Sequence, residues 1–260
     1  EKTSPVIAQE LKVNYLIEGT AQRYGNQVRI LVQLIHAQTD KHRWGNIYEK
    51  EWKDILGIQS EIAKQIAHEL KAVLSPEEIE QIEKKPTDNL MAYDYYLRGN
   101  DYYNRSYAEQ DMNIATKMYE KAIELDINFA LAYTKLTMCH LTMFWEYYDR
   151  SKDRLLKSKQ AIDKAFEINP NLPEAHLALG KYYHQGYLNY SKALEQFEIV
   201  LEHQPNNAEC IYLIACVHRR AGNWEKAEVG FKKAFEFDPR SAKMAQSPGA
   251  TFWLLREYKE

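Results

Sequence analysis

The sequence predicts a mainly α-helical protein in which a small α+β domain precedes a solenoid of helix pairs. Two observations carry this prediction. From about residue 88 onward, small, aromatic and proline residues recur at the spacing of a helix-turn-helix unit of about 34 residues. Before that point apolar and polar residues alternate, as they do in strands with one buried face. A solenoid buries each helix only against its neighbours, and such arrays generally bind rather than catalyse.

Composition excludes several classes of protein. The 260 residues can bury a core without disulfides or metal. The three cysteines, Cys139, Cys210 and Cys216, include no CxxC pair, so we expect inert thiols and a cytoplasmic location. A net charge of −3 with interspersed signs gives no attraction to nucleic acid or anionic lipid. Apolar runs stop far short of the roughly 18 residues of a spanning helix, so no membrane partner is expected.

Residues 1–74 are predicted to form a small α/β domain in the order β-β-β-α, with a three-stranded antiparallel sheet. Alternating apolar residues define the strands, and Gly25-Asn26 supplies a turn signal between the first two. Asp54 can cap the helix that follows, whose apolar residues recur at spacings of three and four. The expected elements are a helical piece near 8–11, strands at 15–24, 28–34 and about 43–52, and a helix at 55–74.

Trp44, Tyr48 and Trp52 alternate on one face of the third strand. They can either pack the sheet against the following helix or form a ligand site. We favour the packing role, because a sheet that is covered by one helix needs large apolar side chains on that face.

A family resemblance accompanies this pattern. It rests on Ile7 to Leu11, Tyr15 to Thr20, Val28 to Ile30, Gln33 to Ile35, Trp44, Tyr48, Asp54-Ile55 and Gln59 to Ala63. These residues resemble the later part of a TolB-N-terminal-like α/β domain. In that family the domain often lies between a signalling output domain and a helical repeat array. The family usually starts with a further strand, helix and strand, and without them we expect one unprotected sheet edge.

Residues 75–87 are predicted to form a linker helix. Ser75 suits the cap position, Pro76 suits the first turn, and the acidic residues after it face the helix dipole. Pro86-Thr87-Asp88 ends this helix and begins the next one, so the domain boundary is expected in this stretch.

Residues 88–260 are predicted to form the repeat array. Its clearest unit holds Ala215, His218, Ala227, Phe231, Ala234 and Pro239. These residues resemble the tetratricopeptide repeat (TPR), and the resemblance implies a right-handed superhelix of about four and a half helix pairs. The expected repeats are 92–129, 130–172, 173–207, 208–241 and a partial one at 242–260.

Three repeats depart from the usual length. The first two carry insertions between their helices, and the third has one extra residue in its turn. In the second repeat, the aromatic segment Phe144 to Tyr148 either extends both helices or forms a packed loop. In the partial repeat, Pro248 lies where a helix interior is expected, which favours a kinked or frayed helix.

The first helices of successive pairs are expected to line a concave groove, and helical spacing identifies their outward positions. The groove is aromatic at one end and basic at the other, so the natural guest is a segment with hydrophobic anchors and an acidic end. The predicted peptide-binding residues are Tyr96, Asn100, Tyr103, Met138, Lys181, His184, Tyr212, Arg219 and Arg220. Only Asn100 matches the lysine and asparagine set of the family's carboxylate-clamp version, so that role is set aside.

For several single residues, a ligand-binding, metal-binding or catalytic role has to be weighed against a packing role. For Tyr96 and Tyr103, a ligand platform and a packing role are equally supported. His140, His176 and His218 occupy packing slots, and no third ligand is placed beside any pair, so no metal or cofactor is expected. The acidic residues lack a partnering motif, and there is no phosphate loop or nucleophile elbow, so no catalytic residue is assigned.

The function predicted from the sequence is a protein-interaction module, a TPR adaptor of a bacterial signalling or regulatory protein that binds a peptide segment. The alternative is the regulatory half of a larger enzyme, such as a nucleotide cyclase or kinase. The chain lacks an initiator methionine and ends at Glu260 within a repeat, so it is expected to be a fragment. Self-association through the open sheet edge or the incomplete last repeat is a third expectation.

Overall fold

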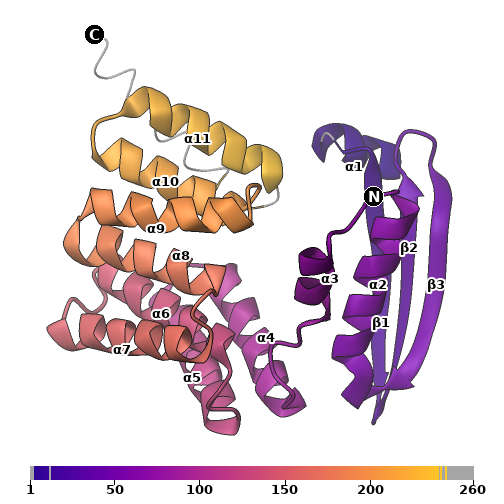
Figure 1. Cartoon of the computed structure of the whole chain (residues 1–260), viewed down its shortest axis with the longest axis horizontal. Coiled ribbons are helices and arrows are strands. Elements are labelled where there is room, and N and C mark those ends of the chain that lie inside the picture. The colour runs from indigo at the N-terminus through magenta and orange to yellow at the C-terminus, as the bar shows by residue number, and fades with distance from the viewer. Residues whose placement is uncertain (1–2, 12, 240, 242–243, 245–260) are drawn as a thin grey trace. The chain divides into compact units, whose positions relative to one another are not determined.

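The computed structural model describes residues 3–11, 13–239, 241 and 244, and the chain divides into two compact units, 1–85 and 86–260. The predicted fold class is confirmed: the protein is mainly α, with a three-stranded antiparallel sheet in the first unit and a solenoid of helix pairs in the second (Figure 1). The partial fifth repeat, including Pro248, falls almost entirely outside the described residues.

The first unit is built on an antiparallel sheet in the order β1-β2-β3. Tyr24 pairs with Gln27, so Gly25-Asn26 is the hairpin turn, and Gly25 has a φ of +60° that suits glycine. The elements are α1 (Ser4–Leu11), β1 (Tyr15–Tyr24), β2 (Gln27–His36), β3 (Lys41–Glu51), a 3₁₀ turn (Trp52–Asp54), α2 (Ile55–Glu69) and α3 (Pro76–Glu83).

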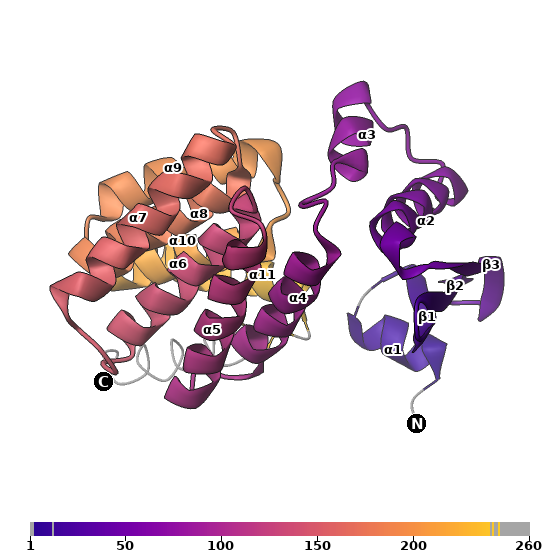
Figure 2. The ribbon, with the colours of Figure 1, turned by 90° about the horizontal axis from the view of Figure 1, so that it is seen from below.

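The two faces of the sheet are covered by different helices, with α2 on one side and α1 on the other (Figure 2). Val28, Val32 and Leu34 of β2 are buried on one face, and Tyr48 of β3, which pairs with Ile30, belongs to the same face. Tyr48 therefore packs the sheet, as expected. By contrast, β1 is exposed along most of its length and forms one edge of the sheet.

One local expectation in this unit is wrong. The Asp54 side chain makes no capping hydrogen bond within the described structure, because a 3₁₀ turn leads directly into α2. Ser75 does cap α3, in a reciprocal capping box with Glu78. The expected linker helix α3 packs on α2 within the first unit, where Ser60 Oγ donates to Ile82 O at 2.6 Å.

The second unit stacks helices in consecutive antiparallel pairs (Figure 1). Asparagine or serine side chains cap the starts of several of them, namely Asn89, Ser151, Asn189 and Asn207. The helices are α4 (Leu90–Arg105), α5 (Glu109–Leu125), α6 (Ala130–Trp145), α7 (Lys152–Ile168), α8 (Pro173–Lys181), α9 (Tyr190–His203), α10 (Ala208–Arg220) and α11 (Trp224–Phe237).

Two of the helix pairs are held by a close approach between their two helices. A Cβ atom built on Gly180 of α8 would lie 2.4 Å from the Phe197 ring of α9, and one built on Gly99 of α4 would lie 2.5 Å from the Tyr119 ring of α5. Both rings are fully buried. The ring of the second helix therefore packs directly on the backbone of the first, which only glycine permits.

The insertions lengthen helices. The regular pair α10 and α11 has 13 and 14 residues, whereas α4 and α6 have 16 each and α5 and α7 have 17 each. The aromatic segment of the second repeat is divided: Phe144 and Trp145 extend α6, while Tyr147 and Tyr148 lie in the turn. The extra residue of the third repeat is accommodated in a π-helical turn, Tyr182–Gly186, at the end of α8.

Replacing Gly180 by alanine tests the close approach. Because the added methyl group overlaps a fully buried ring, we expect Gly180→Ala to lower the free energy of unfolding by about 1–3 kcal/mol, measured by denaturant titration. Gly57→Ala is the matched control, since a Cβ at Gly57 in α2 meets no described atom within 4 Å. We expect that change to be neutral or to stabilise by up to about 1 kcal/mol.

The double variant Gly180→Ala, Phe197→Leu separates steric overlap from any other effect of the alanine. If overlap is the cause, the smaller side chain relieves it and the two changes together cost less than their sum. Strict additivity of the two losses would contradict this account of the helix pair.

Candidate functional site

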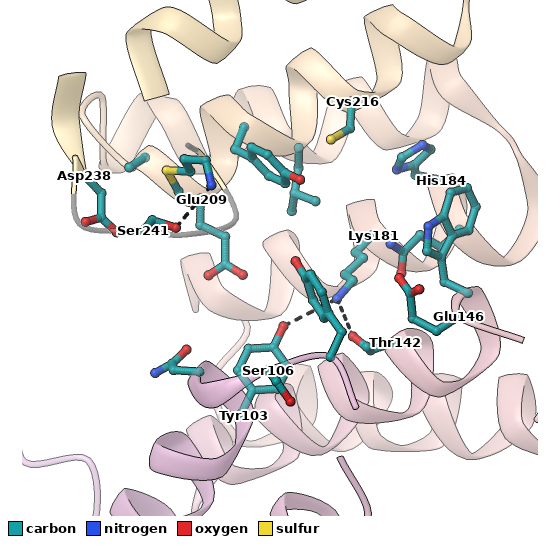
Figure 3. A pocket seen from close by; sticks show the side chains of 18 of the residues that line it. Tyr103, Ser106, Thr142, Glu146, Lys181, His184, Glu209, Cys216, Asp238 and Ser241 are labelled. Carbon is teal, nitrogen blue, oxygen red and sulfur yellow. Dashed lines mark hydrogen bonds between the residues drawn. The ribbon is translucent and has the colours of Figure 1, made fainter. Parts of the chain in front are cut away.

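The second unit contains a cavity of about 950 Å³ that we call the groove (Figure 3). The first helices of the four pairs contribute to it, together with the turns that follow α4 and α11. Its lining comprises Tyr103, Asn104, Arg105, Ser106, Tyr107, Thr142, Trp145, Glu146, Lys181, His184, Gln185, Ala208, Glu209, Tyr212, Leu213, Cys216, Arg219, Arg220, Asp238, Ser241 and Met244.

Lys181 places a positive charge on the wall of the groove. It is the last residue of α8, and its side chain is buried. Its Nζ donates to Thr142 Oγ1 of α6 at 3.1 Å and lies 3.5 Å from the Tyr103 hydroxyl of α4. The ammonium group is thus held between three different helices, so its position is fixed before any partner arrives.

Arg219 and Arg220 supply two further cations from the last turn of α10. The Arg220 guanidinium lies over the Trp145 ring at 4.8 Å from its centroid, and the Arg219 guanidinium lies over Phe231 at 5.1 Å. Among the residues that the structure describes, neither forms a salt bridge, so aromatic faces are their observed partners. A guanidinium stacked in this way keeps its N–H donors available for a carboxylate.

His184 lies in the π-helical turn after α8 and lines the groove. Single π-helical turns shift the direction of the side chains that follow, and they are frequent at functional sites. Trp145 and Tyr190 flank the imidazole, with ring centroids 5.5 Å and 6.0 Å away. The side chain is only 2% exposed, and neither ring nitrogen has a hydrogen-bond partner among the described residues.

Burial lowers the pKa of His184 to about 4, and the positive charges of Arg220, Lys181 and Arg219 add to this effect. The imidazole is therefore neutral at physiological pH.

Charges are separated along the groove. Figure 3 shows Asp238 and Glu209 toward one end and Lys181 and His184 toward the other. Glu146, which is exposed, lies on the rim near Lys181. Burial raises the pKa values of Tyr103 and Tyr107, so these phenols stay protonated and offer hydroxyl donors.

The groove brings together six of the nine residues that spacing assigned to peptide binding: Tyr103, Lys181, His184, Tyr212, Arg219 and Arg220. The other three lie elsewhere. Tyr96 packs against Phe129 and Tyr119, with ring centroids 5.0 Å and 5.9 Å away, and Met138 is buried. Asn100 accepts a hydrogen bond from Tyr119 Oη at 2.8 Å, so it joins the helices of the first pair.

Several lining residues were not assigned from the sequence. Glu209 lies three positions before Tyr212 on α10, so helical spacing could have found it. Thr142 and Trp145 belong to the part of α6 that extends beyond a regular repeat. Tyr107 follows α4 and reaches the groove through the turn, for which the sequence carries no signal.

Other candidate sites have structural roles. No group of histidine, cysteine and acidic residues able to hold a metal occurs among the residues described. His176 Nδ1 lies 2.9 Å from Gln196 Oε1, and Arg154 donates to His140 Nδ1 at 2.9 Å. All three cysteines are free and buried, and burial raises the pKa of Cys210 to about 12.

Within the described part of the chain, no helix combines the length and the apolar character that crossing a bilayer requires.

Sequence comparison places the chain in a family. Residues 61–248, most of the chain, match the model of a family described as "Uncharacterized protein conserved in bacteria (DUF2225)". The chain belongs to the DUF2225 family. One curated relative of this family member is named "Putative adenylate cyclase 3", from Rhizobium meliloti (strain 1021), and is 28% identical over 174 residues. That alignment covers 66% of this chain and 30% of the relative, so the chain spans less than a third of the relative's length.

Solved structures similar to this DUF2225 chain include TPR proteins. One is TTC0263 from Thermus thermophilus, with 17% identity, a TM-score of 0.48 and coverage of 77% of this chain and 97% of the other. Another is the first TPR of Spaghetti (RPAP3) bound to the HSP90 peptide SRMEEVD, with 16% identity, a TM-score of 0.40 and coverage of 54% and 99%. MamA from Desulfovibrio magneticus RS-1 has 18% identity, a TM-score of 0.41 and coverage of 65% and 88%.

The buried histidines make stability depend on pH. His140 and His184 both have a pKa of about 4, in each case mainly because of burial, whereas an unfolded histidine has a pKa near 6.5. Between these values the unfolded chain binds more protons, so the free energy of unfolding falls as pH drops from about 6.5 to about 4. Each histidine contributes at most about 3 kcal/mol to this loss.

Denaturant titrations at several pH values check this expectation. His184→Gln should reduce the dependence in that pH range without abolishing it, because glutamine does not titrate but His140 still does. Gln185→Ala, in the same π-helical turn, should leave the dependence as in the wild type. An equally steep loss in the His184→Gln variant would contradict the role assigned to this imidazole.

Proposed function

We propose that this chain is a protein-interaction module that binds an extended segment of a partner protein in the groove. The observation that carries the proposal is the groove itself, about 950 Å³ in volume and lined by all four first helices, with cations already fixed in it. Fixed side chains lose little freedom on binding, so a larger share of the contact energy appears as affinity.

The chemistry of the groove indicates the guest. Tyr107 and Tyr212 line it with partly accessible rings, and Lys181, Arg219 and Arg220 supply positive charge at one end. Glu209 and Asp238 lie toward the other end. A segment with an apolar side chain followed by an acidic residue complements both features, and charge separation along the groove favours one direction of binding.

Binding, without catalysis, is the role that the titratable groups favour. Tyr103 and Tyr107 remain protonated and His184 remains neutral and buried at physiological pH, since burial shifts the pKa of each away from the neutral range. General acid-base catalysis is most efficient when the pKa lies near the working pH.

The second candidate is the regulatory half of a larger signalling enzyme, and the name of the curated relative favours it. The groove would then recruit a regulator or a second subunit to a cyclase located in another part of the protein. In this arrangement we propose residues 1–74 as a TolB-N-terminal-like domain, 75–87 as a linker and 88–260 as the repeat domain of a cytoplasmic bacterial protein. The exposed edge strand β1 and the repeat at 242–260 are candidate surfaces for self-association.

Selection from a displayed library of random peptides tests the interaction proposal directly. We expect peptides enriched by the full chain to share an aspartate or glutamate beside an apolar residue. Arg219→Ala combined with Arg220→Ala should weaken binding of a selected synthetic peptide at least about tenfold, measured by fluorescence anisotropy, because two charge-assisted contacts are lost.

The double change Lys226→Ala, Lys233→Ala is the matched control. It removes the same charge from exposed positions of α11 that do not line the groove, and it should leave the affinity within about twofold. Equal losses in the two double variants would indicate general electrostatic attraction and would overturn binding in the groove.

A further inference from the structure

We infer that the end of the groove beside the π-helical turn is a carboxylate subsite, in which His184, Lys181, Arg219 and Arg220 receive an acidic side chain of the bound segment, and that its occupation is coupled to protonation of His184. The inference rests on the proposed function and adds to it a specific anchor and a dependence on pH.

The first observation is the unsatisfied imidazole. His184 is 2% exposed, and within the described part of the chain neither Nδ1 nor Nε2 has a hydrogen-bond partner. Buried polar groups in native proteins are nearly always paired, so an exception needs an explanation. His184 lines the groove, and a ligand oxygen that entered there would supply the missing partner.

The second observation is the convergence of positive charge. Lys181 precedes the π-helical turn, and Arg219 and Arg220 reach the same region from α10. The same three cations also act on the buried Cys216 thiol, where they oppose the larger effect of burial on its pKa. The geometry agrees, because Arg220 lies over the Trp145 ring that flanks His184, and Lys181 and Arg219 line the same groove. Such a concentration of positive charge is a favourable environment for an anion.

The groups around His184 come from several elements. They are Lys181 of α8, Tyr190 of α9, Cys216, Arg219 and Arg220 of α10, and Glu146 after α6. Glu146 is the acidic member of this set. Its charge disfavours a doubly charged phosphate more than a singly charged carboxylate, so the balance at this end of the groove suits aspartate or glutamate.

The protonation of His184 depends on the charges that surround it. With the groove free, burial, together with the charges of three cations, holds the pKa of His184 at about 4. A bound carboxylate neutralises part of that charge and stabilises an imidazolium, so the pKa rises and binding takes up a proton. The affinity therefore increases as pH falls. If the pKa reaches about 6 in the complex, the gain between about pH 7.5 and about pH 5.5 is about fourfold.

The experiment uses the full chain with carbon-13-labelled histidine and two probes, hexaglutamate and hexaglutamine. The NMR signal of His184, assigned by its loss in His184→Gln, reports both occupancy and pKa. We expect hexaglutamate to shift this signal and to raise the pKa by at least about one unit, while hexaglutamine and sodium chloride at equal ionic strength do not. Inorganic phosphate should bind more weakly than hexaglutamate.

Two variants complete the design. His184→Gln should still bind hexaglutamate near neutral pH but lose the increase in affinity at lower pH, whereas Arg220→Ala should lose binding at both. An unchanged His184 signal at saturating hexaglutamate, or an equal response to chloride or phosphate, would overturn the subsite. The proposed function fails separately, if no selected peptide loses affinity on replacement of Arg219 and Arg220.

Discussion

The contact on which the second unit depends is the close approach of the two helices in its first and third pairs. Phe197 packs on the backbone of α8 at Gly180, and Tyr119 packs on α4 at Gly99. This contact fixes the separation and rotation of the pair, since a fully buried ring has no room to move. The first helices of all four pairs lie side by side in the stack, and the groove is the surface that they share.

Departures from the regular repeat are concentrated around the groove. The lengthened α6 carries Thr142 and Trp145 into the groove, and the π-helical turn presents His184. The extra residue is accommodated just after the glycine contact, since Gly180 precedes the π-helical turn by two positions. The packed core of the pair is retained while the residues that line the groove vary. A scaffold built in this way can bind different partners through differences in its groove lining.

Sequence spacing assigned Lys181, His184, Tyr212, Arg219 and Arg220 to the groove, and these residues line it in the structure, because helical periodicity determines the face of a residue. It was less successful on α4 and α6. Tyr96 and Asn100 point outward by helical spacing. In the structure, however, the Phe129 ring covers Tyr96, and Tyr119 donates a hydrogen bond to Asn100. Whether an outward position is open depends on the packing of other helices, and one helix considered alone carries no information on that packing.

The sequence by itself determined the class of the fold, the number of complete helix pairs and the position of the strands, because small, aromatic and turn residues impose local periodicity and close contacts. The tertiary structure alone decided where the extra residues of the repeats are accommodated and that Lys181 is buried. It also decided that, among the described residues, the His184 imidazole has no hydrogen-bond partner. These properties arise between helices distant in the chain. Their energies depend on which groups exclude water from one another, and that is settled only when the pairs stack.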